Sequence, residues 1–312
     1  MATETFHTLI ARNKRNSWLL IFGFLVFFAL VGTVIGMAWG GGDVRFGLVI
    51  AAGAAGIGLA IAVGSFFGGS NVLLGFSRAK RIQESDDPEL FHVVEEVCIA
   101  GGLPMPKVYI IDDTAMNAFA TGRDPKHAAV AITRGLRDKL TRDELQGVMA
   151  HEMSHVRHYD IRYAMLMAVM VGVLVVLCDA FLHSLWWGAG TRGRRRSRGK
   201  GGGGAQVVIL VVAIVLAILA PILARLIHMA LSRQREYLAD AGSVELTRNP
   251  QGLASALAKL NGDEEVLEVA NRATAPLYIV HPIKKFEARA SKITKTHPPI
   301  ADRIQRLQSL GV

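Results

Sequence analysis

Long runs of apolar residues dominate the pattern of hydrophobic and polar positions along the chain. There are four such runs, and the third is interrupted only by Asp179 among charged residues. A helix needs about 20 apolar residues to cross the roughly 30 Å hydrocarbon core of a bilayer. The pattern therefore predicts four membrane helices, with these approximate bounds: 18–39, 46–70, 162–186 and 206–228.

Basic residues flank the first two runs and predict their orientation. Three precede the first run and three follow the second, namely Arg12, Lys14, Arg15, Arg78, Lys80 and Arg81. Basic residues favour the cytoplasmic side of a membrane. The first run is longer than the apolar part of a signal peptide and has no clear cleavage site after it, which favours an uncleaved anchor. We expect the N-terminus and the chain after residue 76 to lie in the cytoplasm.

The loop over residues 188–204 does not fit this topology. Its segment 191–200 carries six basic residues and is followed by four glycines. Two full crossings would place this loop outside the cell, against the charge rule. Either the last two helices do not span fully, or the first two dominate the orientation. The loop itself is a solvated segment or a binding site for anionic lipid headgroups or nucleic acid.

Two polar stretches outside these runs are able to fold in water. The first predicts a helix from Asp86 to Ala100 and a capped helix over 142–158, opened by the Thr141/Glu144 capping box. Between them, β-rich segments predict strands over 107–111, 117–121 and 128–133. Later helices are expected over 232–246, 252–260 and 298–310.

The expected fold class is an α-helical membrane protein with an α+β domain outside the membrane. Four parts follow one another along the chain: an N-terminal membrane hairpin (1–76), a cytoplasmic part (77–160), a second membrane hairpin (161–230) and a cytoplasmic C-terminal part (231–312).

Composition supports this division. The 312 residues are 51% hydrophobic and 20% charged, which excludes intrinsic disorder. The two cysteines exclude a disulfide-stapled scaffold. The net charge is +9, and six of the basic residues that produce it lie in the 191–200 segment. The charge therefore does not indicate a nucleic-acid partner.

The capped helix contains His151-Glu152-Met153-Ser154-His155. Residues four apart lie on one helical face, so both imidazoles can bind one Zn²⁺. Glu152 lies beside the metal, where a carboxylate can take a proton from metal-bound water. Apolar neighbours indicate that this helix is buried. The motif therefore predicts a catalytic zinc site.

A catalytic zinc usually has three protein ligands. The best candidate for the third is Glu236, with Asp240 four residues later on the same helical face. Asp240 is then placed to accept a hydrogen bond from the far nitrogen of a ligand histidine and so orient it.

These motifs resemble the HtpX-type membrane zinc metalloproteases, relatives of the CAAX prenyl endopeptidases. HEMSH and, some 80 residues later, REYLADAGS carry the resemblance, supported by NAFATG (117–122) and by THPP (296–299) followed by Arg303. It covers essentially the whole chain. The resemblance implies a gluzincin fold and cleavage of misfolded or damaged membrane proteins, with the site on the cytoplasmic side of a bacterial or archaeal cytoplasmic membrane.

The resemblance also implies roles for individual residues. The zinc ligands are His151, His155 and Glu236, and Glu152 is the general base. The edge strand with Asn117, Ala118 and Phe119 aligns the substrate by backbone pairing. His297 is a further catalytic candidate, which either stabilises the oxyanion or blocks the zinc at rest; it is otherwise a loop histidine. Arg303 is read as structural.

The implied partners are misfolded membrane proteins as substrates, the lipid bilayer, and other membrane proteases with which the chain cooperates. No nucleic-acid partner is expected. Two alternatives stay open. One is a non-proteolytic membrane scaffold with a structural zinc, against which Glu152 argues. The other is a transporter, for which Asp179 and Arg225 are the only strong intramembrane charges.

Overall fold

The computed structural model describes residues 6–174, 233–263, 265, 267, 278–279 and 298–310. Several predictions lie outside these residues: the membrane helix over 206–228, the second half of the helix over 162–186, the loop over 188–204, and His297.

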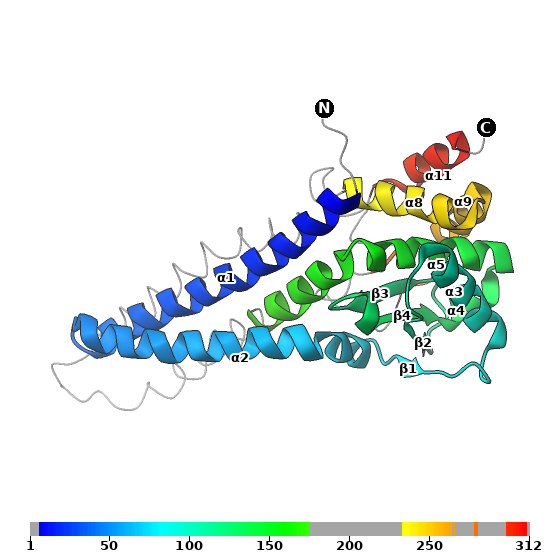
Figure 1. Cartoon of the computed structure of the whole chain (residues 1–312). Helices are drawn as coiled ribbons and strands as arrows, with labels where there is room; N and C mark the ends of the chain where they lie inside the picture. Colours follow the sequence, from blue (N-terminus) through cyan, green and yellow to red (C-terminus); the bar gives the residue numbers. More distant parts are fainter. Residues whose placement is uncertain are drawn as a thin grey trace.

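Two long antiparallel helices form an arm that extends from the rest of the molecule (Figure 1). They are α1 (Phe6–Trp39) and α2 (Val44–Phe76), joined by a short turn in which Asp43 caps α2. The segments Ile10–Met37 and Val44–Phe76 are long and apolar enough to cross a bilayer. The expected start of the first helix near residue 18 is wrong, because the helix continues without a break back to Phe6 through its basic residues.

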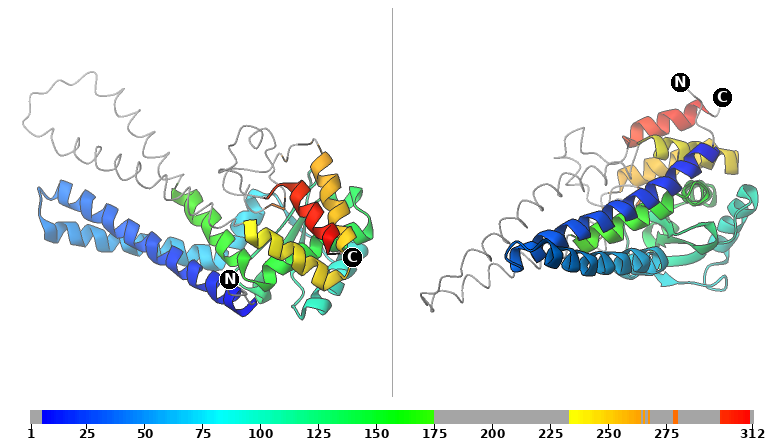
Figure 2. Two further views of the ribbon diagram at one scale, coloured as in Figure 1. Left: turned by 90° about the horizontal axis from the view of Figure 1, so that it is seen from above. Right: turned by 60° about the vertical axis from the view of Figure 1, so that its left-hand side comes forward.

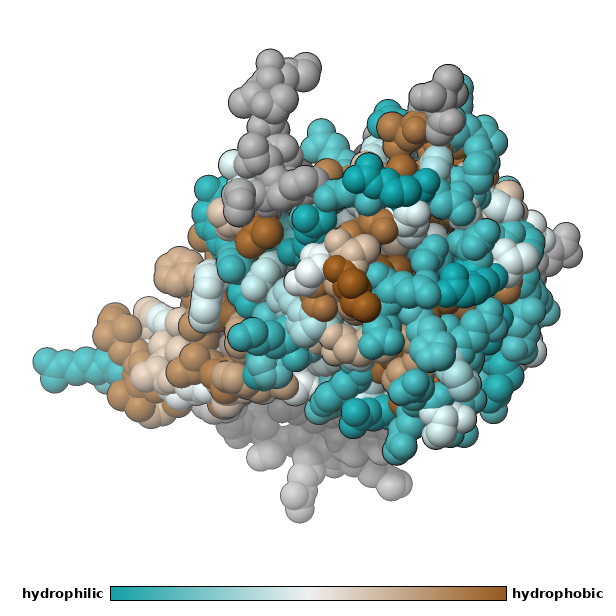
Figure 3. Space-filling view, turned by 45° about the vertical axis from the view of Figure 1, so that its right-hand side comes forward, coloured by the Kyte–Doolittle hydropathy of each residue, from teal (hydrophilic) through white to brown (hydrophobic). Residues whose placement is uncertain are grey.

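The arm is apolar on its outside. Large hydrophobic side chains such as Trp18, Phe22 and Phe67 are more than half exposed there. Figure 3 shows hydrophobic residues gathered at the left and hydrophilic residues over much of the globular part. This distribution is typical of a protein whose arm lies in lipid and whose globular part lies in water.

The described part of the third predicted membrane helix is helical over residues 160–174. It packs against both helices of the arm, because Leu166 and Met170 belong to one buried cluster with Leu20, Phe24 and Leu73. The arm is thus attached to the chain that directly follows the zinc motif.

A four-stranded sheet forms the base of the globular part. Its strands lie in the order β1-β2-β4-β3: β1 (Lys80–Arg81), β2 (Lys107–Ile111), β4 (Ala128–Thr133) and β3 (Ala118–Gly122). The β2/β4 pair is parallel and the two other pairs are antiparallel. β3 is therefore an edge strand, as the resemblance implies. The predicted bounds of β2 and β4 are confirmed, whereas the exposed two-residue β1 was not predicted.

The helix α5 (Arg142–Arg157) is the centre of the globular part, and its capping box is present. It contacts α3, α8, α9 and β3, and Figure 2 shows these elements from two further sides. The other helical elements have these bounds: α3 (Pro88–Gly101), η1 (Pro125–His127), α4 (Arg134–Lys139), α8 (Arg233–Thr247), α9 (Pro250–Gly262) and α11 (Ile300–Ser309).

Small residues bring α8 close to α5. A Cβ atom at Gly242 would lie 2.2 Å from Oγ of Ser154. The next residue, Ser243, is buried and donates a hydrogen bond to the carbonyl of Gly147 at 2.8 Å. This close packing fixes the position of α8, which carries Glu236, relative to the histidines of α5.

Candidate metal centre

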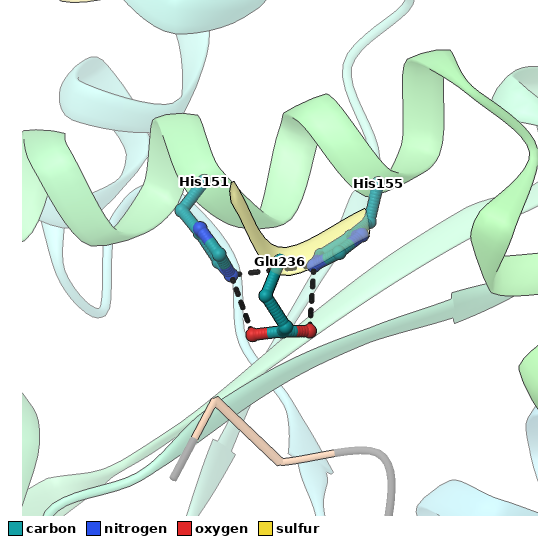
Figure 4. Close-up of side chains that lie close together, drawn as sticks. All are labelled: His151, His155 and Glu236. Carbon is teal, nitrogen blue, oxygen red and sulfur yellow. Dashed lines mark hydrogen bonds and ion pairs between the residues drawn. The ribbon is translucent and has the colours of Figure 1, made fainter. Parts of the chain in front are cut away.

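Three side chains from α5 and α8 converge on one point (Figure 4). The Nε2 atoms of His151 and His155 lie 3.2 Å apart. Oε2 of Glu236 lies 3.8 Å from Nε2 of His151, and Oε1 of the same carboxylate lies 3.7 Å from Nε2 of His155. The structure therefore brings together the three predicted ligands, although their sequence positions are far apart.

The spacing of these atoms fits a zinc ion. Bonds of 2.0–2.1 Å in a tetrahedral site place neighbouring ligand atoms about 3.3 Å apart, close to the three distances observed. Two histidine nitrogens and a carboxylate are also a usual donor set for catalytic zinc. Among the residues that the structure describes, this is the group of His, Cys, Asp or Glu side chains able to hold a metal ion.

An aspartate supports each histidine from behind. Nδ1 of His151 lies 3.0 Å from Oδ1 of Asp240, as the sequence predicted. Nδ1 of His155 lies 3.1 Å from Oδ2 of Asp160, which the sequence analysis missed. Such carboxylates fix the ring orientation and turn Nε2 toward the metal. The signal available for Asp160 was its place five residues after His155, just beyond the end of the motif helix.

Arg303 contacts both Asp240 and the predicted ligand Glu236. Its side chain is fully buried and donates to Asp240 through Nε at 2.9 Å and Nη2 at 2.6 Å. Nη1 lies 3.3 Å from Oε2 of Glu236 and 3.3 Å from the carbonyl oxygen of Ile279. Burial alone would raise the pKa of Asp240, but the charge of Arg303 and the hydrogen bonds from His151 and Arg303 together outweigh burial and hold this pKa below its usual range.

Glu152 lies beside the three predicted ligands, on the same helix as both histidines. Its side chain is 3% exposed. Burial raises its pKa to about 7, although the charge on His155 and a hydrogen bond from the backbone of Ala120 act in the opposite direction. A carboxyl group with a pKa near neutrality can both accept and release a proton at working pH.

The surroundings of His155 favour positive charge. Burial alone would lower its pKa, but the hydrogen bond to Asp160 and the charge of Glu236 raise it to about 9. The same negative groups that favour a proton on this ring also favour a metal cation beside it.

The edge strand β3 contacts α5, the helix that carries both histidines. The three predicted substrate-binding residues are buried, with Asn117 directly before the strand and Ala118 and Phe119 in it. Asn117 uses its Oδ1 to accept a hydrogen bond from the backbone of Ala118. The carbonyl of Ala118 accepts from the backbone N–H of Ile279 at 3.0 Å. Phe119 packs edge to face against Tyr278, with ring centroids 5.1 Å apart. Their contact with substrate stays a prediction.

Comparisons with known proteins match this geometry to a family. Residues 84–310 match Peptidase family M48. The chain is 42% identical to a "Protease HtpX homolog" of Ligilactobacillus salivarius, over 96% of this chain and 98% of that protein. Similar proteins of the same description from Listeria monocytogenes and Lactiplantibacillus plantarum are 43% and 44% identical over the same shares.

A solved structure, "Crystal Structure of S. mikatae Ste24p", matches with a TM-score of 0.45 and 18% sequence identity, over 96% of this chain and 66% of that one. The family assignment does not depend on it, because the matches above span nearly the whole chain. This chain belongs to peptidase family M48 and is an HtpX-type metalloprotease with membrane helices.

Proposed function

We propose that the chain is a zinc-dependent membrane endopeptidase with one zinc ion held by His151, His155 and Glu236. The observation that carries this proposal is the convergence of the three ligand atoms, with an aspartate behind each histidine. When bound, zinc would lower the pKa of a water molecule and polarise the scissile carbonyl. A structural zinc site would have no use for a buried carboxyl group such as Glu152 at this place.

Glu152 acts as the general base in this proposal. Its burial keeps the charged form unfavourable, so the carboxylate readily takes a proton from the attacking water and then passes it to the leaving amine. The backbone N–H of Ala120 holds the carboxylate toward β3. The base and the edge strand are thus linked directly.

The substrate peptide pairs with the edge of β3 in this proposal, along Asn117, Ala118 and Phe119. Backbone pairing gives affinity with little demand on side chains, which suits a protease for misfolded chains. Because the carbonyl of Ala118 already bonds to Ile279, a bound peptide either displaces Ile279 or begins its pairing at the carbonyl of Ala120, whose N–H bonds to Glu152. His297 remains a proposed catalytic residue.

The proposed substrates are misfolded or damaged membrane proteins, cut on the cytoplasmic side of a bacterial membrane. The helix over 160–174 begins five residues after His155 and packs into the apolar arm. At 1.5 Å per residue this separation is on the order of 10 Å. We infer that the catalytic part, a gluzincin fold, sits close to the bilayer and works beside other membrane proteases.

A cleavage map tests this substrate class. The purified chain would be placed in proteoliposomes with an unfolded membrane protein, and with the same protein's isolated soluble loops as a control. We expect chelator-sensitive cuts within cytoplasmic segments near the membrane. Cuts that fall evenly over soluble loops, at equal rates without the membrane anchor, would contradict the proposal.

A further inference from the structure

A polar residue of α1 reaches the globular part of the molecule. Asn13 lies in the first turns of this helix, before the apolar run, and its side chain is 2% exposed. Its Nδ2 donates to Oδ1 of Asp160 at 2.7 Å and to the carbonyl oxygen of His158 at 2.9 Å. Two acceptors at these distances fix the orientation of the amide, because only its NH₂ end can donate.

Asp160 connects this contact to the metal centre. One carboxylate oxygen accepts from Asn13, and the other lies 3.1 Å from Nδ1 of the proposed zinc ligand His155. Arg235 approaches the Asn13 side of the carboxylate at 3.5 Å. Asp160 is buried, so each of its hydrogen bonds counts strongly in setting the direction of the carboxylate.

The backbone that carries Asp160 needs support. Tyr159, directly before it, has a φ of +61°, a left-handed conformation that is unfavourable for a residue with a bulky side chain. Asn13 donates hydrogen bonds to the carbonyl of His158, before Tyr159, and to the carboxylate of Asp160, after it. The neighbouring Lys14 lies over the ring of Tyr159, 4.3 Å from its centroid. The first turns of α1 therefore stabilise the turn that directly follows α5.

We infer that Asn13 is a positioning residue for the metal centre, which acts through Asp160 on His155. It would join the membrane arm to the catalytic helix, so that the placement of α1 sets the orientation of a zinc ligand. The inference rests on the proposed role of His155 as a ligand. Loss of a carboxylate or its partner behind a metal ligand typically costs about 10–100-fold in metal affinity.

The test uses Co²⁺ as a probe for the metal site of the full chain in detergent. Asn13→Leu keeps the branched shape of the side chain and removes its NH₂ donor group, and Asn13→Ala provides a second variant that adds no volume. Asn16→Leu, three residues along the same helix, is the matched control. Binding is followed by the visible absorption bands of Co²⁺, whose position and intensity report the coordination geometry, and the fold is checked by thermal unfolding.

We expect both Asn13 variants to bind Co²⁺ about tenfold more weakly and with altered absorption bands, while Asn16→Leu matches the unchanged chain. His155→Ala should lose the bands. If His155→Ala loses them and the Asn13 variants match Asn16→Leu, the inference is wrong and the metal site stands. If His155→Ala keeps the affinity and the bands, the metal-site assignment is wrong and the inference falls with it.

Discussion

Arg303 on α11 donates two hydrogen bonds to the carboxylate of Asp240 on α8, at 2.9 and 2.6 Å. Asp240 in turn lies 3.0 Å from Nδ1 of His151. The C-terminal helix therefore supports the metal centre, although Arg303 and Asp240 are 63 positions apart in sequence. Two parallel bonds from a planar guanidinium fix both the distance and the plane of the carboxylate.

Replacing Arg303 by lysine should weaken the metal site. Lysine keeps the charge but cannot form the two-pronged contact with Asp240. We expect zinc affinity to fall by about tenfold, as for other losses of an outer partner. Competition with a chromophoric chelator measures this. Arg306→Lys on the same helix is the control, because Arg306 lies over the ring of Tyr237 and does not reach the metal ligands; equal affinities for the two variants would contradict the role of Arg303.

The rate of cleavage should depend on the protonation of Glu152. A general base must be deprotonated, so a raised pKa means that activity is present at higher pH and is lost as pH falls through that pKa. With the pKa of Glu152 at about 7, and with zinc favouring the charged form, kcat/KM should show an acid limb at or below neutral pH. A profile that stays flat down to pH 4 would contradict the assignment.

Gly242→Ala should separate α8 from α5. The new Cβ atom would meet Oγ and Cβ of Ser154, at 2.2 and 2.9 Å. We expect a loss of about 1–3 kcal/mol in the free energy of unfolding, together with weaker zinc binding, because Glu236 lies on the same helix. Thermal unfolding in detergent and metal titration measure both effects.

Gly262→Ala is the matched control, because nothing lies within 4 Å of the position its Cβ would take. Alanine is a better helix former than glycine, so this variant should be unchanged or slightly more stable. Similar stability of the two variants would show that the close approach at Gly242 is not needed.

Local patterns predicted the parts of the structure that local geometry determines. The spacing of His151 and His155 follows from the helical repeat, and Thr141 with Glu144 marks the start of α5 because capping involves neighbours in sequence. The strands β2 and β4 were recognised by their β-branched and apolar residues. Glu236 was selected as the third candidate ligand because it pairs with Asp240 at helical spacing and the His151–His155 motif requires one more ligand.

The supporting contacts could not be predicted in this way, because they join residues far apart in sequence. Asn13 and Asp160 are separated by 147 positions, and a single asparagine before an apolar run gives no sign of its partner. The early start of α1 was missed for a similar reason: its basic residues are typical of a loop beside the membrane, yet Lys14 has a ring contact in the folded chain.

The most direct test of the zinc mechanism is to measure zinc content and cleavage together in Glu152→Gln. We expect one zinc ion per chain, as in the unchanged protein, and a loss of peptide cleavage by at least about a hundredfold, because the amide cannot take the proton from water. Glu95→Gln, an exposed change on α3, should keep both zinc and activity. Cleavage by Glu152→Gln at the normal rate, with zinc bound, would contradict the account.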